Sequence, residues 1–183
     1  LRQHIYAKDT KANLWITLTP CPVADTYKPI DVITYEDKRF YYCNAKTLNL
    51  IPSCLAATAA ERANCSEAIF HRDDIVTECA HSNVSIFKDG YVITHQLDDK
   101  VLPGTARLRL LAFAEKLGYK TEERDYTLEE LMNADEIIVH STGSFCIPVK
   151  TVDGKAVGGK APEMLKKIQD ALVADFEAQC AAE

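Results

Sequence analysis

The chain has 183 residues, enough for one well-buried domain or two small ones. Its composition is that of a globular protein, 47% hydrophobic and 26% charged, with a formal net charge of −6. The negative charge argues against a chain built to wrap nucleic acid, and no apolar run is long enough to cross a bilayer.

The start of the chain and its cysteines bear on where the protein works. The first residues lack the apolar core of a signal peptide, and there is no initiator Met, so residues 1–11 look like the middle of a longer protein. Seven cysteines are scattered without a C-x-x-C pair or a histidine at zinc-ligand spacing. We therefore expect reduced thiols, most of them small buried side chains, a cytoplasmic location and no metal site.

In the first half of the chain, residues 14–18 and 32–34 have the composition of strands. An Ala-rich segment within residues 48–63 predicts a helix, with Pro52 in its first turn. Four short strand-like runs follow, at residues 67–71, 75–78, 84–88 and 91–94. The Asp-Gly turn between the last two favours a hairpin, and the four runs together predict an antiparallel meander.

The second half alternates helices and strands. Residues 105–117 carry apolar side chains at helical spacing and end at Gly118, and a capping box at residues 127–130 opens a short helix. Strands are expected at residues 136–140 and 149–152, and a last helix at residues 162–176. This order predicts a mixed α+β fold with a barrel-like, strongly curved sheet and surrounding helices.

Two residues in the first half are candidates for chemistry. Lys46 stands between an extended segment and a helix, where a rigidly held amine could form a Schiff base. Glu78 ends an apolar strand, and a carboxylate buried there would need a cationic partner, for which a protonated pyridine nitrogen would serve. Taken singly, each residue also fits an ordinary position on a solvated surface.

Two further segments fit an anion site. Gly104 and Thr105 lead into the helix of residues 105–117, and a helix N-terminus presents free backbone N–H groups and a positive dipole end. Ser141 and Thr142 follow a buried strand and could close a second side. A common helix cap and a hydroxyl-rich turn would explain the same residues, so the interpretation depends on the order of all four segments.

That order resembles the class IV (fold type IV) pyridoxal-phosphate-dependent aminotransferases, most closely the D-amino-acid aminotransferases, over about residues 15–158. Residues 36–50 resemble the segment that carries the Schiff-base lysine, and residues 77–84 resemble the strand whose glutamate pairs with the pyridine nitrogen. The loop and helix of the phosphate cup have counterparts at residues 97–107, and the second phosphate-binding turn at residues 141–142.

The resemblance implies a role for each matching residue. Lys46 would hold pyridoxal 5'-phosphate and transfer protons, Glu78 would keep the ring nitrogen protonated, and Leu102 would pack on the ring face away from Lys46. Five residues of the two anion segments and one arginine would lie around the phosphate: Gly104, Thr105, Ala106, Ser141, Thr142 and Arg39.

The function implied is a transaminase that moves an amino group between a D-amino acid and a 2-oxo acid, as a homodimer acting on small molecules. Residues 1–30 would then be a remnant of an N-terminal domain and a linker, and residues 31–183 the cofactor-binding C-terminal domain. Residues 46–50 favour the D-amino-acid branch over the branched-chain one, in which an aromatic residue usually follows the lysine motif.

Three departures leave alternatives open. Ala106 stands where the family commonly has Thr, and Ala80 and His81 stand where the D-amino-acid enzymes tend to have serines. The family's N-terminal domain, which supplies an arginine for the phosphate, is almost wholly absent from the chain. An aminodeoxychorismate lyase of the same fold would share the lysine, the glutamate and the phosphate cup. Besides the transaminase and this lyase, the third hypothesis is a non-catalytic fragment.

Overall fold

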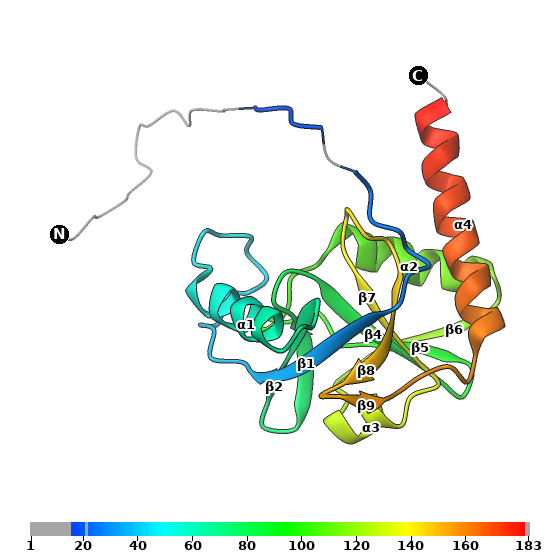
Figure 1. Cartoon of the computed structure of the whole chain (residues 1–183). Coiled ribbons are helices and arrows are strands. Elements are labelled where there is room, and N and C mark those ends of the chain that lie inside the picture. Colours follow the sequence, from blue (N-terminus) through cyan, green and yellow to red (C-terminus); the bar gives the residue numbers. More distant parts are fainter. Residues whose placement is uncertain (1–15, 21, 182–183) are drawn as a thin grey trace.

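The structure is a computed structural model that describes residues 16–20 and 22–181, in which strands form one curved mixed sheet flanked by helices (Figure 1). The strands are β1 (Ile30–Glu36), β2 (Glu67–Arg72), β3 (Ile75–Cys79), β4 (Asn83–Lys88), β5 (Tyr91–Thr94), β6 (Lys120–Glu123), β7 (Glu136–His140), β8 (Ile147–Val152) and β9 (Lys155–Ala156). The helices are α1 (Ile51–Arg62), α2 (Thr105–Lys116), α3 (Leu128–Met132) and α4 (Pro162–Ala181).

The sheet runs in the order β3-β2-β1-β8-β7-β4-β5-β6, and β9 pairs with β8. β1 lies parallel to both β2 and β8, with Thr34 opposite Ile69, whereas β7 is antiparallel to both β8 and β4, with Val139 opposite Val84. The predicted mixed α+β fold with a curved sheet and surrounding helices is confirmed.

The predicted meander of four strands is only half right. β2 pairs with β3, and β4 pairs with β5, both antiparallel as expected. β3 and β4 are not neighbours in the sheet, because β4 pairs along its length with β7 instead. No residue of β7 is exposed, so this buried strand is most stable in the middle of the sheet, where its backbone groups are paired on both sides.

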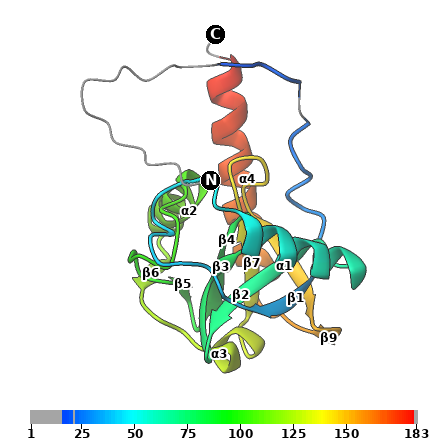
Figure 2. The ribbon, with the colours of Figure 1, turned by 90° about the vertical axis from the view of Figure 1, so that its left-hand side faces the viewer.

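Helices cover separate parts of the sheet, as Figures 1 and 2 show. α1 packs through the small side chains of Ala56 and Ala60 in a cluster with Ala68 and Phe70 of β2. α2 and α4 contact each other and share a second cluster that includes Leu110, Leu111, Ile168 and Leu172. A third cluster joins several strands with α3 and includes Ile69, Ile86, Leu131 and Ile137.

The local signals at the helix ends are confirmed. Gly118 follows α2 with a φ of +84°, a conformation that favours glycine, and Thr127 and Glu130 form the expected capping box of α3. β6 and β9 are short strands that the sequence pattern did not predict. Of the expected strand at residues 14–18, residues 14–15 lie outside the described part, and residues 16–18 form no strand.

The cysteines of the described segments are free thiols, but only Cys79 and Cys146 are buried, so the expectation that most are core residues was wrong. In the same segments, no helix combines the length and the apolar character that spanning a lipid bilayer requires.

Candidate active site

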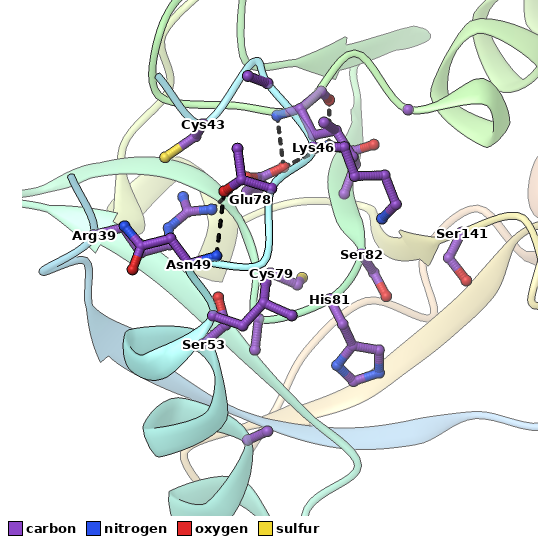
Figure 3. Close-up of a pocket in the computed structure, with 18 of the residues that line it drawn as sticks. Arg39, Cys43, Lys46, Asn49, Ser53, Glu78, Cys79, His81, Ser82 and Ser141 are labelled. Carbon is purple, nitrogen blue, oxygen red and sulfur yellow. Dashed lines mark hydrogen bonds and ion pairs between the residues drawn. The ribbon is translucent and has the colours of Figure 1, made fainter. Parts of the chain in front are cut away.

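The expected site residues lie on the wall of one cavity of about 690 Å³, a size typical of small-molecule sites (Figure 3). All nine of them line it: Arg39, Lys46, Glu78, Leu102, Gly104, Thr105, Ala106, Ser141 and Thr142. They come from the loop before α1, from β3, from the loop into α2 and from the turn after β7. The fold therefore brings together segments that are separated by up to about a hundred residues.

Glu78 is the buried charge of the cavity and only 5% exposed. Its Oε1 accepts a hydrogen bond from Arg39 Nη1 at 2.5 Å, and its Oε2 accepts from Asn83 Nδ2 and from the Leu102 backbone N–H, both at 2.9 Å. Burial raises the pKa of Glu78, and the charge and hydrogen bond of Arg39 oppose that rise. The carboxylate is thus fixed in orientation by three donors.

A second part of the cavity lining lies at the start of α2. Gly104 precedes the helix without a side-chain cap, and among the described residues nothing accepts a hydrogen bond from the N–H of Thr105 or Ala106. Thr105 Oγ1 and Thr142 Oγ1 are 3.0 Å apart, which joins the turn after β7 to the helix. We call Gly104, Thr105, Ala106, Ser141 and Thr142 the α2 end of the cavity.

Arg39 bonds to Asp37 and Glu78 and, among the described residues, makes no hydrogen bond to the α2 end. Its Nε and Nη2 both donate to Asp37 at 2.9 Å, Nη2 also donates to the Lys100 carbonyl at 3.0 Å, and the guanidinium lies 4.5 Å from the centre of the Phe70 ring. Because Nε and Nη2 are already hydrogen-bonded to these groups, the Arg39 side chain is held beside Glu78. The contacts of Arg39 are thus with two buried carboxylates, and the expectation that it lies near a phosphate stays a prediction.

Lys46 lies on the irregular segment between β1 and α1, and its side chain is exposed. Figure 3 shows it pointing into the cavity, between Glu78 and Ser141. Leu102 is half-buried, and its backbone N–H bonds to Glu78, so its side chain is held as part of the apolar wall. An amine, a buried carboxylate and a helix N-terminus thus face one space.

Gly104 is a glycine for a steric reason. A Cβ at this position would lie 2.2 Å from Asn83 Oδ1. Asn83 cannot easily move away, since its Nδ2 donates both to Glu78 and to the Leu102 carbonyl, each at 2.9 Å. Asn83 was missed by the sequence analysis as a site residue, although it stands in the same block as Glu78.

His140 is a second residue that the sequence did not single out. It is fully buried, ends β7 directly before Ser141, and its Nε2 pairs with Ser85 Oγ at 2.9 Å. Burial lowers the pKa of His140 from 6.5 to about 3, with a smaller contribution from the charge of Arg107. The ring is therefore neutral at physiological pH.

The positions where serines were expected form a different structure. Ala80 is buried, while His81 lines the cavity and its Nδ1 lies 3.1 Å from Oε2 of the buried Glu67. Ser82 Oγ donates to the same oxygen at 3.0 Å. This wall therefore presents an imidazole backed by a carboxylate in place of a small hydroxyl.

Comparison with known proteins decides which family this site represents. Residues 2–152 match the profile of the amino-transferase class IV family, which is more than half of the chain. The chain belongs to the class IV aminotransferase family. Among curated relatives, a D-alanine aminotransferase of Listeria monocytogenes is 40% identical over 150 residues, which are 81% of this chain and 52% of the relative. A D-alanine aminotransferase of Bacillus licheniformis is 37% identical, over 82% of this chain and 54% of the relative.

A solved class IV structure shares the fold. The branched-chain amino acid aminotransferase of Escherichia coli superposes with a TM-score of 0.73 at 27% identity, over 82% of this chain and 52% of that protein. The chain thus spans about half the length of the relatives it matches.

We predict that Gly104→Ala destabilises the protein by about 1–3 kcal/mol, because the new Cβ displaces Asn83 and breaks its hydrogen bonds to buried groups. Gly143→Ala is the matched control, since a Cβ there meets no atom within 4 Å. Urea unfolding of both variants measures the difference. Equal stabilities would show that Asn83 adjusts without loss.

We predict that His140 makes the protein less stable in acid. Its pKa is about 3 when folded and 6.5 ordinarily, so the unfolded chain takes up a proton between these values and stability falls as the pH drops below 6.5. At about pH 5 the loss is about 2 kcal/mol. The measurement is the unfolding free energy at about pH 7.5 and at about pH 5, in the unsubstituted protein and in His140→Gln. The decrease between the two pH values should be smaller in His140→Gln by that amount. An equal decrease in both proteins would contradict the prediction.

Proposed function

We propose that this chain forms the cofactor-binding part of a pyridoxal-phosphate-dependent transaminase that moves an amino group between a D-amino acid and a 2-oxo acid. The proposal rests on one observation: Lys46, Glu78 and the α2 end all line the same cavity. The name of the curated relatives, D-alanine aminotransferase, supports the D-amino-acid substrate.

The residues present fit this cofactor at both of its charged ends. Glu78 is a buried carboxylate that burial disfavours as an anion, so a cationic ring nitrogen beside it would be stabilised. At the α2 end lie backbone N–H groups that find no acceptor among the described residues, and the Thr105 and Thr142 hydroxyls, which contact each other; a helix N-terminus attracts a phosphate. The cavity between these ends is large enough for a small aromatic ring.

When bound, the cofactor supplies an aldehyde that accepts a primary amine and a ring that acts as an electron sink. Lys46 Nζ would hold the cofactor covalently through its aldehyde carbon, with loss of water, and, once the substrate amine had displaced it, the freed Lys46 amine would move the proton to and from the substrate Cα. Glu78 would hold the proton on the ring nitrogen, with Arg39, Asn83 and the Leu102 N–H keeping its carboxylate in place. Leu102 would provide the apolar wall for the ring.

The phosphate would depend on backbone donors more than on side-chain charge in this part of the protein. Ala106 offers no hydroxyl, and Thr105 and Thr142 are the hydroxyls that meet at the α2 end. A helix N-terminus carries roughly half an elementary charge, less than a dianion needs for compensation. Arg39 is held by Asp37 and Glu78, so each contact at the α2 end gains in importance.

We further propose a cytoplasmic homodimer. Around the cavity, several large apolar side chains are exposed, among them Phe40 (72%), Tyr42 (77%), Leu48 (95%) and Ile51 (72%). An apolar patch of this kind favours a protein contact that covers it. Free thiols, as in the described cysteines, are typical of a reducing compartment.

We predict that borohydride reduction of the protein with pyridoxal 5'-phosphate, followed by peptide mapping, places the pyridoxyl group on Lys46. Lys38 is the internal control, because it is exposed and paired with Glu36 at 2.8 Å. Lys46→Ala should remove the label. A label on Lys38, or none despite bound cofactor, would contradict the proposed function.

We predict that Thr142→Val weakens the binding of pyridoxal 5'-phosphate by about tenfold, because it removes one of two hydroxyls that meet at the α2 end. Thr58→Val is a control, since Thr58 lies on the exposed side of α1 and bonds to the Cys54 carbonyl. Fluorescence titration measures both affinities. Equal affinities would mean that the phosphate lies elsewhere.

A further inference from the structure

A cluster of four charged side chains, Asp37, Arg39, Arg72 and Glu78, extends from the cavity lining, where Arg39 and Glu78 lie, into the protein behind it. Their side chains are 0%, 11%, 18% and 6% exposed, respectively. The two arginines and two carboxylates balance in charge. Asp37 does not line the cavity, and neither the family resemblance nor the roles proposed above give it a function.

The Asp37 carboxylate accepts more hydrogen bonds than the Glu78 carboxylate, the other acid of this cluster. Its Oδ1 accepts from the Arg39 backbone N–H at 3.1 Å and from Arg39 Nε at 2.9 Å. Its Oδ2 accepts from Arg39 Nη2 at 2.9 Å, from Arg72 Nε at 3.1 Å and from Thr77 Oγ1 at 3.2 Å. Its own N–H donates to the His71 carbonyl at 2.8 Å, which anchors it to the end of β2.

These bonds leave Arg39 with one orientation. Asp37 holds two sides of the guanidinium fork, so Nη1 is directed at Glu78. Arg72 secures the backbone by donating from Nη2 to the Arg39 carbonyl at 3.1 Å, and the Phe70 ring packs against the guanidinium. Arg39 therefore cannot approach or leave Glu78 independently of Asp37.

The sharing of Arg39 has an electrostatic consequence. Burial acts to raise the pKa of Asp37, but the hydrogen bonds and charge of Arg39 outweigh it and hold the pKa below its ordinary value, so Asp37 is ionised. Arg39 thus divides its positive charge between two carboxylates. If Asp37 were neutral, the whole charge would act on Glu78 and would compete with a cationic ring nitrogen for the same carboxylate.

We propose that Asp37 is a positioning residue that fixes Arg39 and, by sharing its charge, determines how much negative charge Glu78 keeps for the cofactor's ring nitrogen. The coupling of Asp37 to Glu78 is a property of the chain itself. Only the last step, from Glu78 to the ring nitrogen, rests on the proposed function.

The coupling is tested without cofactor, by ¹³C NMR titration of the Glu78 carboxyl in the full 183-residue chain. Asp37→Asn should lower the pKa of Glu78 by on the order of one unit, because it removes a neighbouring negative charge. Arg72→Gln should raise the pKa of Glu78, because Asp37 loses its pairing with Arg72 and then attracts the positive charge of Arg39 more strongly, away from Glu78. Arg72 is at the more exposed edge of the cluster, so this variant serves if Asp37→Asn does not fold.

Asp31→Asn is the matched control, since Asp31 pairs with Lys150 and Thr151 on a separate groove and should leave Glu78 unchanged. A residue that only stabilises the fold would alter the unfolding free energy without moving the Glu78 titration in opposite directions in the two variants. An unchanged Glu78 pKa, or shifts of the same sign in both variants, would overturn the proposal.

The last step is tested with ¹⁵N-labelled pyridoxal 5'-phosphate, whose ring nitrogen shift reports its protonation. In Asp37→Asn the signal should move toward that of a neutral pyridine. A shifted Glu78 pKa with an unmoved ring signal would overturn the link to the cofactor. Failure of the unsubstituted chain to bind cofactor would instead contradict the proposed function, and the Glu78 titration would then decide the coupling alone.

Discussion

The burial of one carboxylate, Glu78, determines the layout of the cavity. A carboxylate removed from water is costly unless donors surround it, and here three donors do so from three parts of the chain. Arg39 comes from the segment after β1, Asn83 from the start of β4, and the Leu102 N–H from the loop before α2. These segments converge because each satisfies the same two oxygens.

The same bonds connect the two ends of the cavity. Asn83 donates to Glu78 and also lies against Gly104, directly before α2, where a side chain would clash with it. A movement of the Glu78 carboxylate would therefore displace the N-terminus of α2, and a movement of that N-terminus would displace the carboxylate. In the proposed function, the distance between the ring nitrogen site and the phosphate site would be maintained by this contact, because neither end can relax alone.

The cavity has a wall of regular helix and strand elements and a less regular rim. Its wall consists of β3, β7 and the start of α2, with His140, Glu78 and Ala106 buried. The rim is the irregular segment between β1 and α1, which carries Lys46 and exposed aromatic side chains. A binding group on a loop over a fixed scaffold is a common arrangement in enzymes, since the scaffold sets geometry and the loop adapts to ligand. In the proposed homodimer, the apolar rim would be a surface that the second copy covers.

Features that depend on near neighbours were readable from the sequence. The helix starts, the capping box of Thr127 and Glu130, and the turn glycine Gly118 depend on residues within one turn, so local chemistry decides them. Lys46, Glu78 and the segments of the α2 end were also singled out as candidates, because their order along the chain resembles a known family. Whether they meet in space could not be deduced from local pattern, and the fold shows that all line one cavity.

Only the tertiary structure decided which strands pair and which charges partner. β4 pairs with β7, about fifty residues away, instead of β3, because a fully buried strand needs two paired neighbours and periodicity cannot name them. The sequence could not show that Arg39 pairs with Asp37 and Glu78, because a buried charge pairs with the opposite charges that the fold brings near it. The sequence by itself determined the elements and the chemical groups, and the distances between those groups came from long-range packing.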